Sequence, residues 1–301
     1  MASWQAHVTT WILKWTLKPK LARAETALHA RKLMRPRPFT PPTGVRITPE
    51  RIGGVPGEWV EASAAEVTML YLHGGGYFAC SAETHRPITT AFAKNGFRVF
   101  APDYRLAPEF PFPAAIEDAA AVYRGLLEQG IPAAKIVVGG DSAGGGLTLA
   151  LLLSLRAAGT ALPAAAVLFS PWSDLASTGD SIRTNDKRCA MFRGARLAHG
   201  ASYYLGSADA RNPLASPLYA NLAGLPPMIV HVGGDEVLLD DSTRLAERAR
   251  AAGVRVELKI WPVVPHVWQI VPTMPEARQS LKEVSTFLMA SVESGAKHVG
   301  V

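Results

Sequence analysis

Ser142 stands two residues after one glycine and two residues before another, in the stretch Gly140-Asp141-Ser142-Ala143-Gly144. A strand that turns sharply into a helix at a serine needs positions without a Cβ on both sides, because the chain approaches itself there. Such a turn exposes the hydroxyl, and the first amides of the helix stabilise negative charge beside it. The pattern indicates a nucleophilic serine for acyl transfer. The alternatives are a turn without chemistry and, less well matched because no Lys-Ser or Lys-Thr pair follows the glycines, a phosphate-binding loop.

A second glycine-rich segment, residues 73–77 (His-Gly-Gly-Gly-Tyr), follows the apolar run 67–72. Acyl transfer develops an oxyanion, and each backbone donor held near that oxygen is worth about 3–4 kcal/mol in the transition state. Three successive glycines leave backbone amides uncovered, so we expect this loop to supply such donors; a merely flexible turn is the alternative. His73 is expected to be a structural hydrogen-bonding residue rather than a base.

Two acids follow the apolar run 228–232 and a pair of glycines. An acid just beyond the carboxyl end of a parallel strand lies on the edge of the sheet where ligands bind. We predict that Asp235 is the acid that works with the serine. Glu236 is its rival, or else a solvated loop charge, while Asp240 and Asp241 are expected to cap and begin the next helix.

His266 lies in a proline-bounded loop after the strand-like run 255–260, and completes the order serine, acid, histidine. An ordinary polar loop residue is the alternative for a histidine taken by itself. His231 lies within an expected strand and is interpreted as a core or supporting residue. The remaining histidines lie elsewhere. The N-terminal arm holds His7 and His29, the tail holds His298 and the expected insertion holds His199, while His73 and His85 come before the acid.

Five motifs in this order resemble the hormone-sensitive-lipase-like esterases, family IV of the bacterial lipolytic enzymes, over roughly residues 67–288. They are HGGGY at 73–77, DYRLAPE at 103–109, GDSAGGG at 140–146, DEVLLDD at 235–241 and PHVW at 265–268. The resemblance implies an α/β-hydrolase core with a mainly parallel sheet flanked by helices, a helical cap over the acyl site, and a catalytic triad of Ser142, Asp235 and His266.

The resemblance also implies an oxyanion hole made by the amides of Gly74, Gly75 and Ala143. Glu109 corresponds to a glutamate that supports the active-site region, and Gly140 and Gly144 support the serine turn. Many family members carry a glycine and an aromatic residue after the histidine, where this chain has Val267 and Trp268. The resemblance therefore does not determine which residues form the wall of the acyl pocket. Four residues are candidates for binding substrate: Tyr77, Tyr204, Leu205 and Trp268. The alternative for Tyr204 and Leu205, with Tyr203, is that they only hold the cap together.

The function expected from these residues is hydrolysis of short- to medium-chain acyl esters through an acyl-enzyme, without a metal or cofactor. An amidase, a lactonase or a specific deacetylase would use the same triad. A non-catalytic small-molecule receptor is the alternative from another class, because plant hormone receptors share the fold of this family and retain much of the motif around the serine. Those receptors lack the triad histidine, so His266 argues for the enzyme.

The alternation of strands and helices predicts one α/β domain over residues 45–301. A hairpin-like start at 45–62 precedes the expected strands 67–72, 97–101, 135–139, 165–170, 228–232 and 254–260. Helices are expected over residues 113–129, 142–158, 240–252 and 275–291. The alternation lapses at about 174–213, and we expect this insertion to form the cap together with an N-terminal arm over 1–44. Strand 254–260 is a candidate edge for a homodimer.

The net charge of +6 comes from the arm: its first 40 residues hold eight basic residues and one acid, against 23 basic and 24 acidic residues beyond them. The catalytic part is therefore near neutral, and no groove for nucleic acid is implied. With two cysteines in the chain, a disulfide scaffold is not expected. A small ester is the expected partner.

Apolar residues of the arm recur at helical spacing: Trp4, Val8, Trp11, Ile12 and Trp15. Such a face can anchor a helix to a membrane surface or pack over the core, and we favour packing within the cap. Lysines at 14 and 18 interrupt the apolar stretch, so a signal peptide is not indicated. No run reaches the ~18–20 apolar residues of a membrane span. We expect no stable membrane insertion and a cytoplasmic protein.

Overall fold

The computed structural model describes residues 2–36, 38–62 and 65–298. An eight-stranded sheet forms the centre of the molecule, with the order β1-β2-β4-β3-β5-β6-β7-β8. The strands are β1 (Arg46–Ile52), β2 (Val55–Glu61), β3 (Val67–Leu72), β4 (Phe97–Pro102), β5 (Ile136–Asp141), β6 (Ala165–Phe169), β7 (Met228–Gly233) and β8 (Val256–Trp261). Strand β2 is antiparallel to both β1 and β4, and the other neighbours are parallel. The expected α/β-hydrolase architecture is confirmed.

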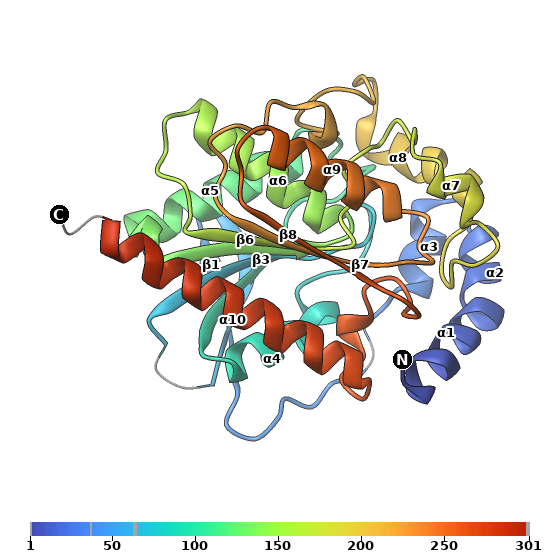
Figure 1. Cartoon of the computed structure of the whole chain (residues 1–301), viewed down its shortest axis with the longest axis horizontal. Helices are drawn as coiled ribbons and strands as arrows, with labels where there is room; N and C mark the ends of the chain where they lie inside the picture. Colours follow the sequence, from blue (N-terminus) through green and yellow to red (C-terminus); the bar gives the residue numbers. More distant parts are fainter. Residues whose placement is uncertain (1, 37, 63–64, 299–301) are drawn as a thin grey trace.

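Helices cover both faces of the sheet (Figure 1). One face carries α5 (Ala114–Glu128), α6 (Ala143–Ala157) and α9 (Leu239–Ala251), and the other carries α4 (Arg86–Lys94) and α10 (Pro275–His298). Each face has its own apolar layer, the larger under α5 and α6 and the smaller under α4 and α10. The central strands β3, β5, β6 and β7 are buried along their whole length. This is why they read as continuous apolar runs.

The expected strands and the four expected helices are present, with ends shifted by a few residues. Helix α10 is longer than expected, because it continues to His298. Helix α4 was not expected from the sequence. It has nine residues, with a proline near its start and two threonines inside it, so its propensity for helix is low and packing on β4 decides its structure.

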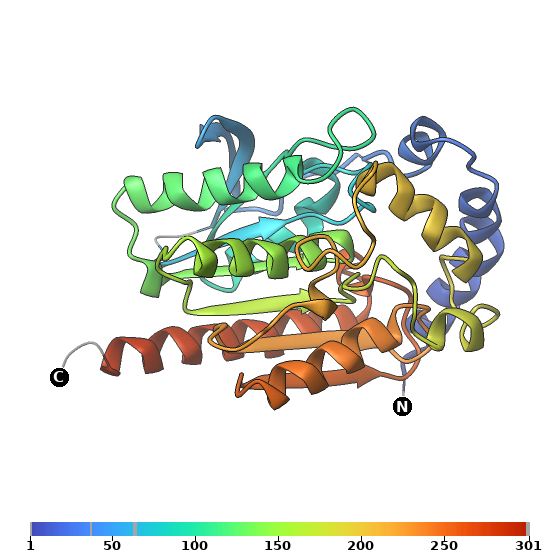
Figure 2. The same cartoon turned by 90° about the horizontal axis from the view of Figure 1, so that it is seen from above.

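Five helices gather at the end of the sheet toward which the parallel strands point (Figure 2). Three come from the arm, α1 (Trp4–Thr16), α2 (Lys18–Ala22) and α3 (Ala27–Leu33), and two from the insertion, α7 (Ser181–Thr184) and α8 (Leu197–Leu205). The arm and the insertion are tied by polar contacts: the amino group of Lys18 donates to the carbonyl of Cys189 at 2.8 Å, and the Tyr203 hydroxyl to that of Glu25 at 2.8 Å. Segments far apart in sequence are thus joined above the strand ends.

Helix α1 does not pack as expected. Its apolar residues Trp4, Trp11 and Trp15 are 71%, 64% and 66% exposed, and Val8 and Ile12 are 45% exposed. Ala6, on the opposite side, is its buried residue. The expectation that this apolar face packs within the cap is therefore wrong. No described helix is long and apolar enough to cross a membrane.

Helix α6 passes so close to the end of β3 that one position must lack a side chain. A Cβ at Gly144 would lie 2.0 Å from the Leu72 carbonyl oxygen and 2.6 Å from that of His73, both in backbone that cannot move independently. A Cβ at Gly140 would meet the same Leu72 oxygen at 2.4 Å. The glycines on either side of Ser142 therefore permit the contact between α6 and the loop after β3.

Replacing Gly144 by alanine is expected to destabilise the protein by about 1–3 kcal/mol or more, because the clash exceeds the gain in helix propensity of up to about 1 kcal/mol. Gly200 in α8 is the matched control, since its Cβ would lie at an ordinary 3.5 Å from Phe78. Gly200→Ala should be neutral or stabilising. Urea unfolding of the two variants tests this, and equal midpoints would contradict it.

Candidate active site

Ser142 lies at the tip of the turn between β5 and α6. Its backbone has φ 53° and ψ −121°, a region that non-glycine residues avoid at a cost of about 1–3 kcal/mol. Hydrogen bonds hold this conformation: the Ser142 amide donates to Phe169 O at 2.8 Å, and the Trp172 amide donates to Ser142 O at 2.8 Å. The side chain is largely shielded, with 8% of the residue exposed. The sharp turn from strand to helix predicted from the glycine spacing is present.

His266 contacts Glu236 rather than Asp235. Nδ1 of His266 and Oε2 of Glu236 form a short hydrogen bond, and both side chains are buried. The other carboxylate oxygen of Glu236 accepts hydrogen bonds from the Ser170 hydroxyl at 2.6 Å and the Gly233 amide at 2.7 Å. Both oxygens of the buried carboxylate therefore have partners, and the ring of His266 is held in one orientation.

Asp235 points to the surface. Its carboxylate lies 3.3 Å from the guanidinium of Arg188, and its side chain is 31% exposed. The prediction that Asp235 is the acid beside the histidine is corrected to Glu236. The turn after β7 explains the difference, because the Glu236 amide donates back to Gly233 O at 3.1 Å and directs the second acid, not the first, inward.

The other ring nitrogen of His266, Nε2, is buried and has no hydrogen-bond partner among the described residues. Phe192 from the insertion lies edge-on to the ring, with centroids 5.0 Å apart. In unliganded sites the contact between a nucleophile and its base is often long. A neutral imidazole fixed at Nδ1 and open at Nε2 can accept a proton.

The three predicted oxyanion donors are not equivalent. The Gly74 amide already donates to Oδ1 of Asp141 at 3.2 Å, so the expectation that it faces an oxyanion is corrected. The amides of Gly75, Gly76 and Ala143 have no acceptor among the described residues. Gly75 and Gly76 have φ of +114° and +65°, which turns the loop back on itself. Ala143 begins α6, where the helix dipole favours negative charge.

Asp141 connects the serine turn to the glycine loop. Its buried carboxylate accepts from the Tyr71 hydroxyl at 2.8 Å and contacts Nε2 of His85 at 3.2 Å, in addition to the Gly74 amide. Burial by itself would raise the pKa of Asp141, but the charge and hydrogen bond of His85, together with Tyr71, hold this pKa below its usual value. Burial lowers the pKa of His85, but the charge and hydrogen bond of Asp141, together with the hydrogen bond to Ser81 O, outweigh burial, so that the pKa of His85 is raised. Both shifts favour the charged forms of the two side chains.

His73 has the structural role that its position suggested. Its ring stacks on Tyr104 with centroids 4.2 Å apart, and the Tyr104 hydroxyl donates to His73 O at 2.6 Å. Burial, followed by the charge of His85, lowers the pKa of His73 to about 3. The ring is therefore neutral under ordinary conditions, and Tyr104 of the 103–109 motif supports the glycine loop through it.

Glu109 reaches the glycine loop through an arginine of the arm. Its carboxylate forms an ion pair with Arg31 of α3 at 2.5 Å, and Arg31 also donates to Phe78 O at 2.5 Å and Ala107 O at 2.7 Å. The hydrogen bond from Arg31 lowers the pKa of Glu109 to about 2. The side chain of Glu109 is half exposed, so its contribution is to position Arg31 against the loop.

Two of the four residues expected to bind substrate form a stacked pair beside the serine turn. The rings of Tyr77 and Tyr204 lie 3.8 Å apart, and both residues are buried. Leu205 follows Tyr204 and packs against the same apolar layer. Trp268 lies elsewhere, in a cluster with Trp261 and the start of α10. The structure therefore does not bring Trp268 to the tyrosine pair.

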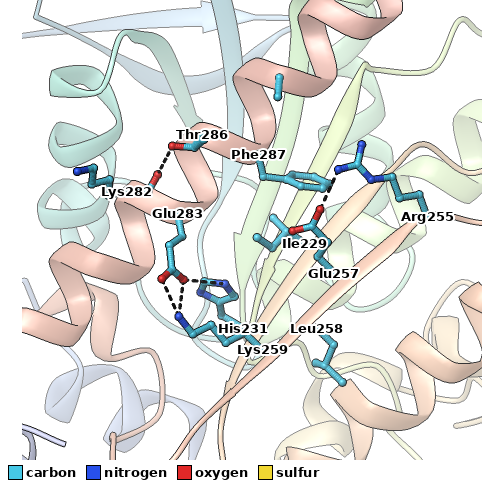
Figure 3. Close-up of a pocket in the computed structure, with 11 residues that line it drawn as sticks. Ile229, His231, Arg255, Glu257, Leu258, Lys259, Lys282, Glu283, Thr286 and Phe287 are labelled. Carbon is cyan, nitrogen blue, oxygen red and sulfur yellow. Dashed lines mark hydrogen bonds and ion pairs between the residues drawn. The ribbon is translucent and has the colours of Figure 1, made fainter. Parts of the chain in front are cut away.

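A groove of about 640 Å³ lies between β8 and α10, away from these residues (Figure 3). His231 faces it, and its Nδ1 contacts the Ser280 hydroxyl at 2.8 Å. Burial lowers the pKa of His231 to about 4, in keeping with a supporting core residue. Lys259 and Glu283 close an ion pair across the groove at 2.7 Å. No member of the Ser142, Glu236 and His266 set lines it.

Comparison with known proteins places this fold and site in a family. A family described as the alpha/beta hydrolase fold matches residues 69–270. An acetyl-hydrolase of Streptomyces hygroscopicus is 45% identical over 82% of this chain and 83% of its own length. The crystal structure of EstE5 soaked with p-nitrophenyl butyrate matches with a TM-score of 0.92 and 40% identity over 97% of this chain and 100% of that one. An esterase from the bacterial hormone-sensitive lipase family matches with a TM-score of 0.89 and 40% identity, over 97% and 99% of the two chains.

These similarities and the fold define a carboxylic-ester hydrolase of the α/β-hydrolase class. Within that class, the chain belongs to the family of hormone-sensitive-lipase-like esterases.

Some residues of the site were not predicted from the sequence. Gly76 was visible as the third glycine of its loop, and Asp141 stood next to the serine, but nothing in the spacing assigned them roles. His85 carried no signal, because its partner Asp141 lies 56 residues further along the chain. Glu236, the acid that contacts His266, is the direct neighbour of the predicted acid, Asp235.

Substitution of the two neighbouring acids tests the corrected assignment. Glu236→Gln should lower kcat for ester hydrolysis by about 10³–10⁴-fold, because the amide neither stabilises an imidazolium nor holds the correct tautomer. Asp235→Asn, the matched control one residue away, should change kcat less than about tenfold, since its ion pair is at the surface. Initial rates on p-nitrophenyl butyrate measure both. A larger loss in Asp235→Asn would contradict the geometry.

Proposed function

We propose that the protein is a serine carboxylesterase acting on short- to medium-chain acyl esters, with Ser142 as nucleophile, His266 as base and Glu236 as the acid that orients it. The observation that carries the proposal is the buried pair of Glu236 and His266, whose outer ring nitrogen is unpartnered among the described residues. That nitrogen belongs to the loop after β8. This loop and the Ser142 turn both follow the carboxyl-terminal ends of parallel strands, and so lie at the same end of the sheet.

In the first step, Ser142 Oγ attacks the ester carbonyl and His266 Nε2 takes its proton. The Glu236 carboxylate stabilises the resulting imidazolium across Nδ1. The carbonyl oxygen becomes an oxyanion. When the intermediate collapses, the bond to the alcohol breaks, and the imidazolium gives its proton to the leaving alkoxide. The acyl group stays on Ser142.

In the second step, a water molecule gives its proton to His266 and attacks the acyl-enzyme. The bond between the acyl carbon and Ser142 Oγ then breaks, the serine oxygen recovers the proton, and the carboxylic acid leaves. Every proton is held by His266 in turn, so these residues complete the reaction by themselves.

The oxyanion is assigned to the amides of Gly75, Gly76 and Ala143. They are supported as donors because none of the three has an acceptor among the described residues, whereas the Gly74 amide is already bonded to Asp141. In a serine protease, which forms the same kind of oxyanion, removing a single donor lowers kcat by about 10²–10³-fold.

The preference for short acyl chains is supported by the aromatic side chains around the serine turn. Tyr77, Trp172 and Tyr204 are each at most 4% exposed, and the Trp172 amide bonds the backbone of Ser142 itself. The ring of Tyr77 stacks on that of Tyr204, and its centroid lies 6.4 Å from that of Trp172. Rings packed in this way leave little room for a long chain. The name of the Streptomyces relative, an acetyl-hydrolase, agrees with a small acyl group.

Initial rates on p-nitrophenyl esters from acetate to palmitate test the proposal. We expect a maximum at acetate to hexanoate, and loss of at least about 10³-fold in Ser142→Ala because the nucleophile is removed. Ser154→Ala is the matched control: Ser154 is also on α6, and its hydroxyl has no hydrogen bond among the described residues. This variant should keep the rate of the parent.

Two other results would change the assignment. Faster cleavage of p-nitroacetanilide than of the acetate ester would point to an amidase. Binding of esters without turnover would point to a receptor, and a maximum at palmitate would contradict the short-chain pocket.

A further inference from the structure

The exposed face of α1 reverses the pattern of an ordinary surface helix. Surface helices of soluble proteins turn their apolar stripe inward and their charges outward. In α1 the outward face carries five large apolar residues, all at least 45% exposed: Trp4, Val8, Trp11, Ile12 and Trp15. We refer to these five residues as the aromatic face. A contiguous apolar face of this kind marks an interaction surface.

The opposite side of α1 holds the helix in place. Ala6 is fully buried against a cluster that includes Trp261 and Trp268. Ser3 caps the helix, and its amide and hydroxyl donate to the carboxylate of Glu276 in α10 at 2.6 Å and 2.8 Å. The body of the protein therefore fixes α1 by its small and polar side, and the aromatic face is left exposed. Helix α1 lies at the edge of the molecule (Figure 1).

A basic groove of about 340 Å³ adjoins this face at Trp15. Cationic residues from the arm and from the insertion line it: Lys14, Lys18, Arg23, Lys187 and Arg193. No carboxylate is among the lining residues. Lys18 is engaged with the carbonyl of Cys189, and Arg193 with Asp186 at 2.9 Å.

The other three cations of the groove have no acidic partner among the described residues: Lys14, Arg23 and Lys187. The groove therefore carries a positive charge that the protein itself does not neutralise. A negatively charged group of suitable size can occupy it while remaining next to Trp15.

We propose that the aromatic face and the basic groove together dock the protein on the surface of an anionic phospholipid bilayer. Tryptophan rings favour the boundary between headgroups and acyl chains, and nearby lysine and arginine residues are attracted to anionic lipid. The groove takes the headgroup phosphate while Trp4, Trp11 and Trp15 enter the boundary. Docking is peripheral, since no described helix can span a bilayer.

Charge favours a lipid surface over a second copy of this chain. In a two-fold dimer the same patch meets itself, so that two sets of unpaired cations would enter one interface, and neither groove has a carboxylate in its lining to pair with them. An anionic bilayer complements both features of the patch. Because α1 lies at the end of the molecule that also carries α7 and α8, docking turns the region above the strand ends toward the lipid (Figure 2).

Tryptophan fluorescence of the full chain with vesicles tests the proposal. The aromatic face holds three of the seven tryptophans, and the other four are at most 5% exposed: Trp59, Trp172, Trp261 and Trp268. A blue shift on adding vesicles of phosphatidylglycerol and phosphatidylcholine therefore reports on α1. The shift should be absent with pure phosphatidylcholine. It should weaken between about 0.1 M and 1 M salt, as the Debye length falls from about 10 Å to about 3 Å.

Co-sedimentation with the same vesicles compares variants. The double variant Trp11→Ala/Trp15→Ala should bind at least about tenfold more weakly, because two rings leave the lipid boundary. Phe110→Ala is the matched control, since Phe110 is an exposed aromatic residue, at 49%, outside α1. Lys14→Gln/Arg23→Gln should reduce the preference for anionic vesicles. The changed side chains are at the surface, so thermal unfolding should be unaltered in all three.

Three results would overturn the proposal: no binding of the parent to anionic vesicles, equal binding by the Trp11→Ala/Trp15→Ala variant, or a stable dimer in sedimentation velocity that this variant abolishes. The last result would assign the face to a second copy. The assays use the Ser142→Ala protein as well as the parent. Because binding needs no turnover, failure of docking is distinguishable from failure of the proposed esterase activity.

Discussion

The arrangement of the candidate active site depends on the hydrogen bonds made by the buried carboxylate of Asp141. It lies at the end of β5, directly before Ser142, and binds the Gly74 amide, the Tyr71 hydroxyl and the ring of His85. A charge in this environment is tolerated only because each of these groups compensates for lost water. The serine turn and the glycine loop are thereby fixed to one another. Because the Gly74 amide is used in this way, we propose the next two amides of the loop as the oxyanion donors.

The same requirement explains which acid faces the histidine. A buried carboxylate needs hydrogen-bond donors to replace its lost water. The Ser170 hydroxyl and the Gly233 amide donate to Glu236. Asp235 has a shorter side chain and a surface arginine instead. The order of serine, acid and histidine in the sequence pointed to the loop whose acid contacts His266. It could not distinguish two adjacent acids, because the choice depends on how the turn after β7 closes.

The elements that could be predicted from the sequence are those whose neighbouring residues are strongly restricted by burial or by steric contact. The central strands were recognisable because burial on both faces demands continuous apolar runs, and the serine turn because its glycines are sterically required. The arm was interpreted less well. The spacing of Trp4, Val8 and Trp11 correctly predicted a helix, but spacing cannot say whether an apolar face meets the core or solvent. That depends on the anchoring of Ser3 and Ala6 to residues more than 250 positions away. The dimer contact expected at β8 stays a prediction.

A crystal structure of the protein after reaction with a p-nitrophenyl alkylphosphonate tests the central claim most directly, because the adduct resembles the tetrahedral intermediate. The account predicts phosphorus on Ser142 Oγ, with the phosphoryl oxygen about 3 Å from the amides of Gly75, Gly76 and Ala143. The Gly74 amide should still donate to Asp141, and Glu236 should still hold His266. A phosphoryl oxygen bound by the Gly74 amide, or phosphorus on another residue, would contradict the account.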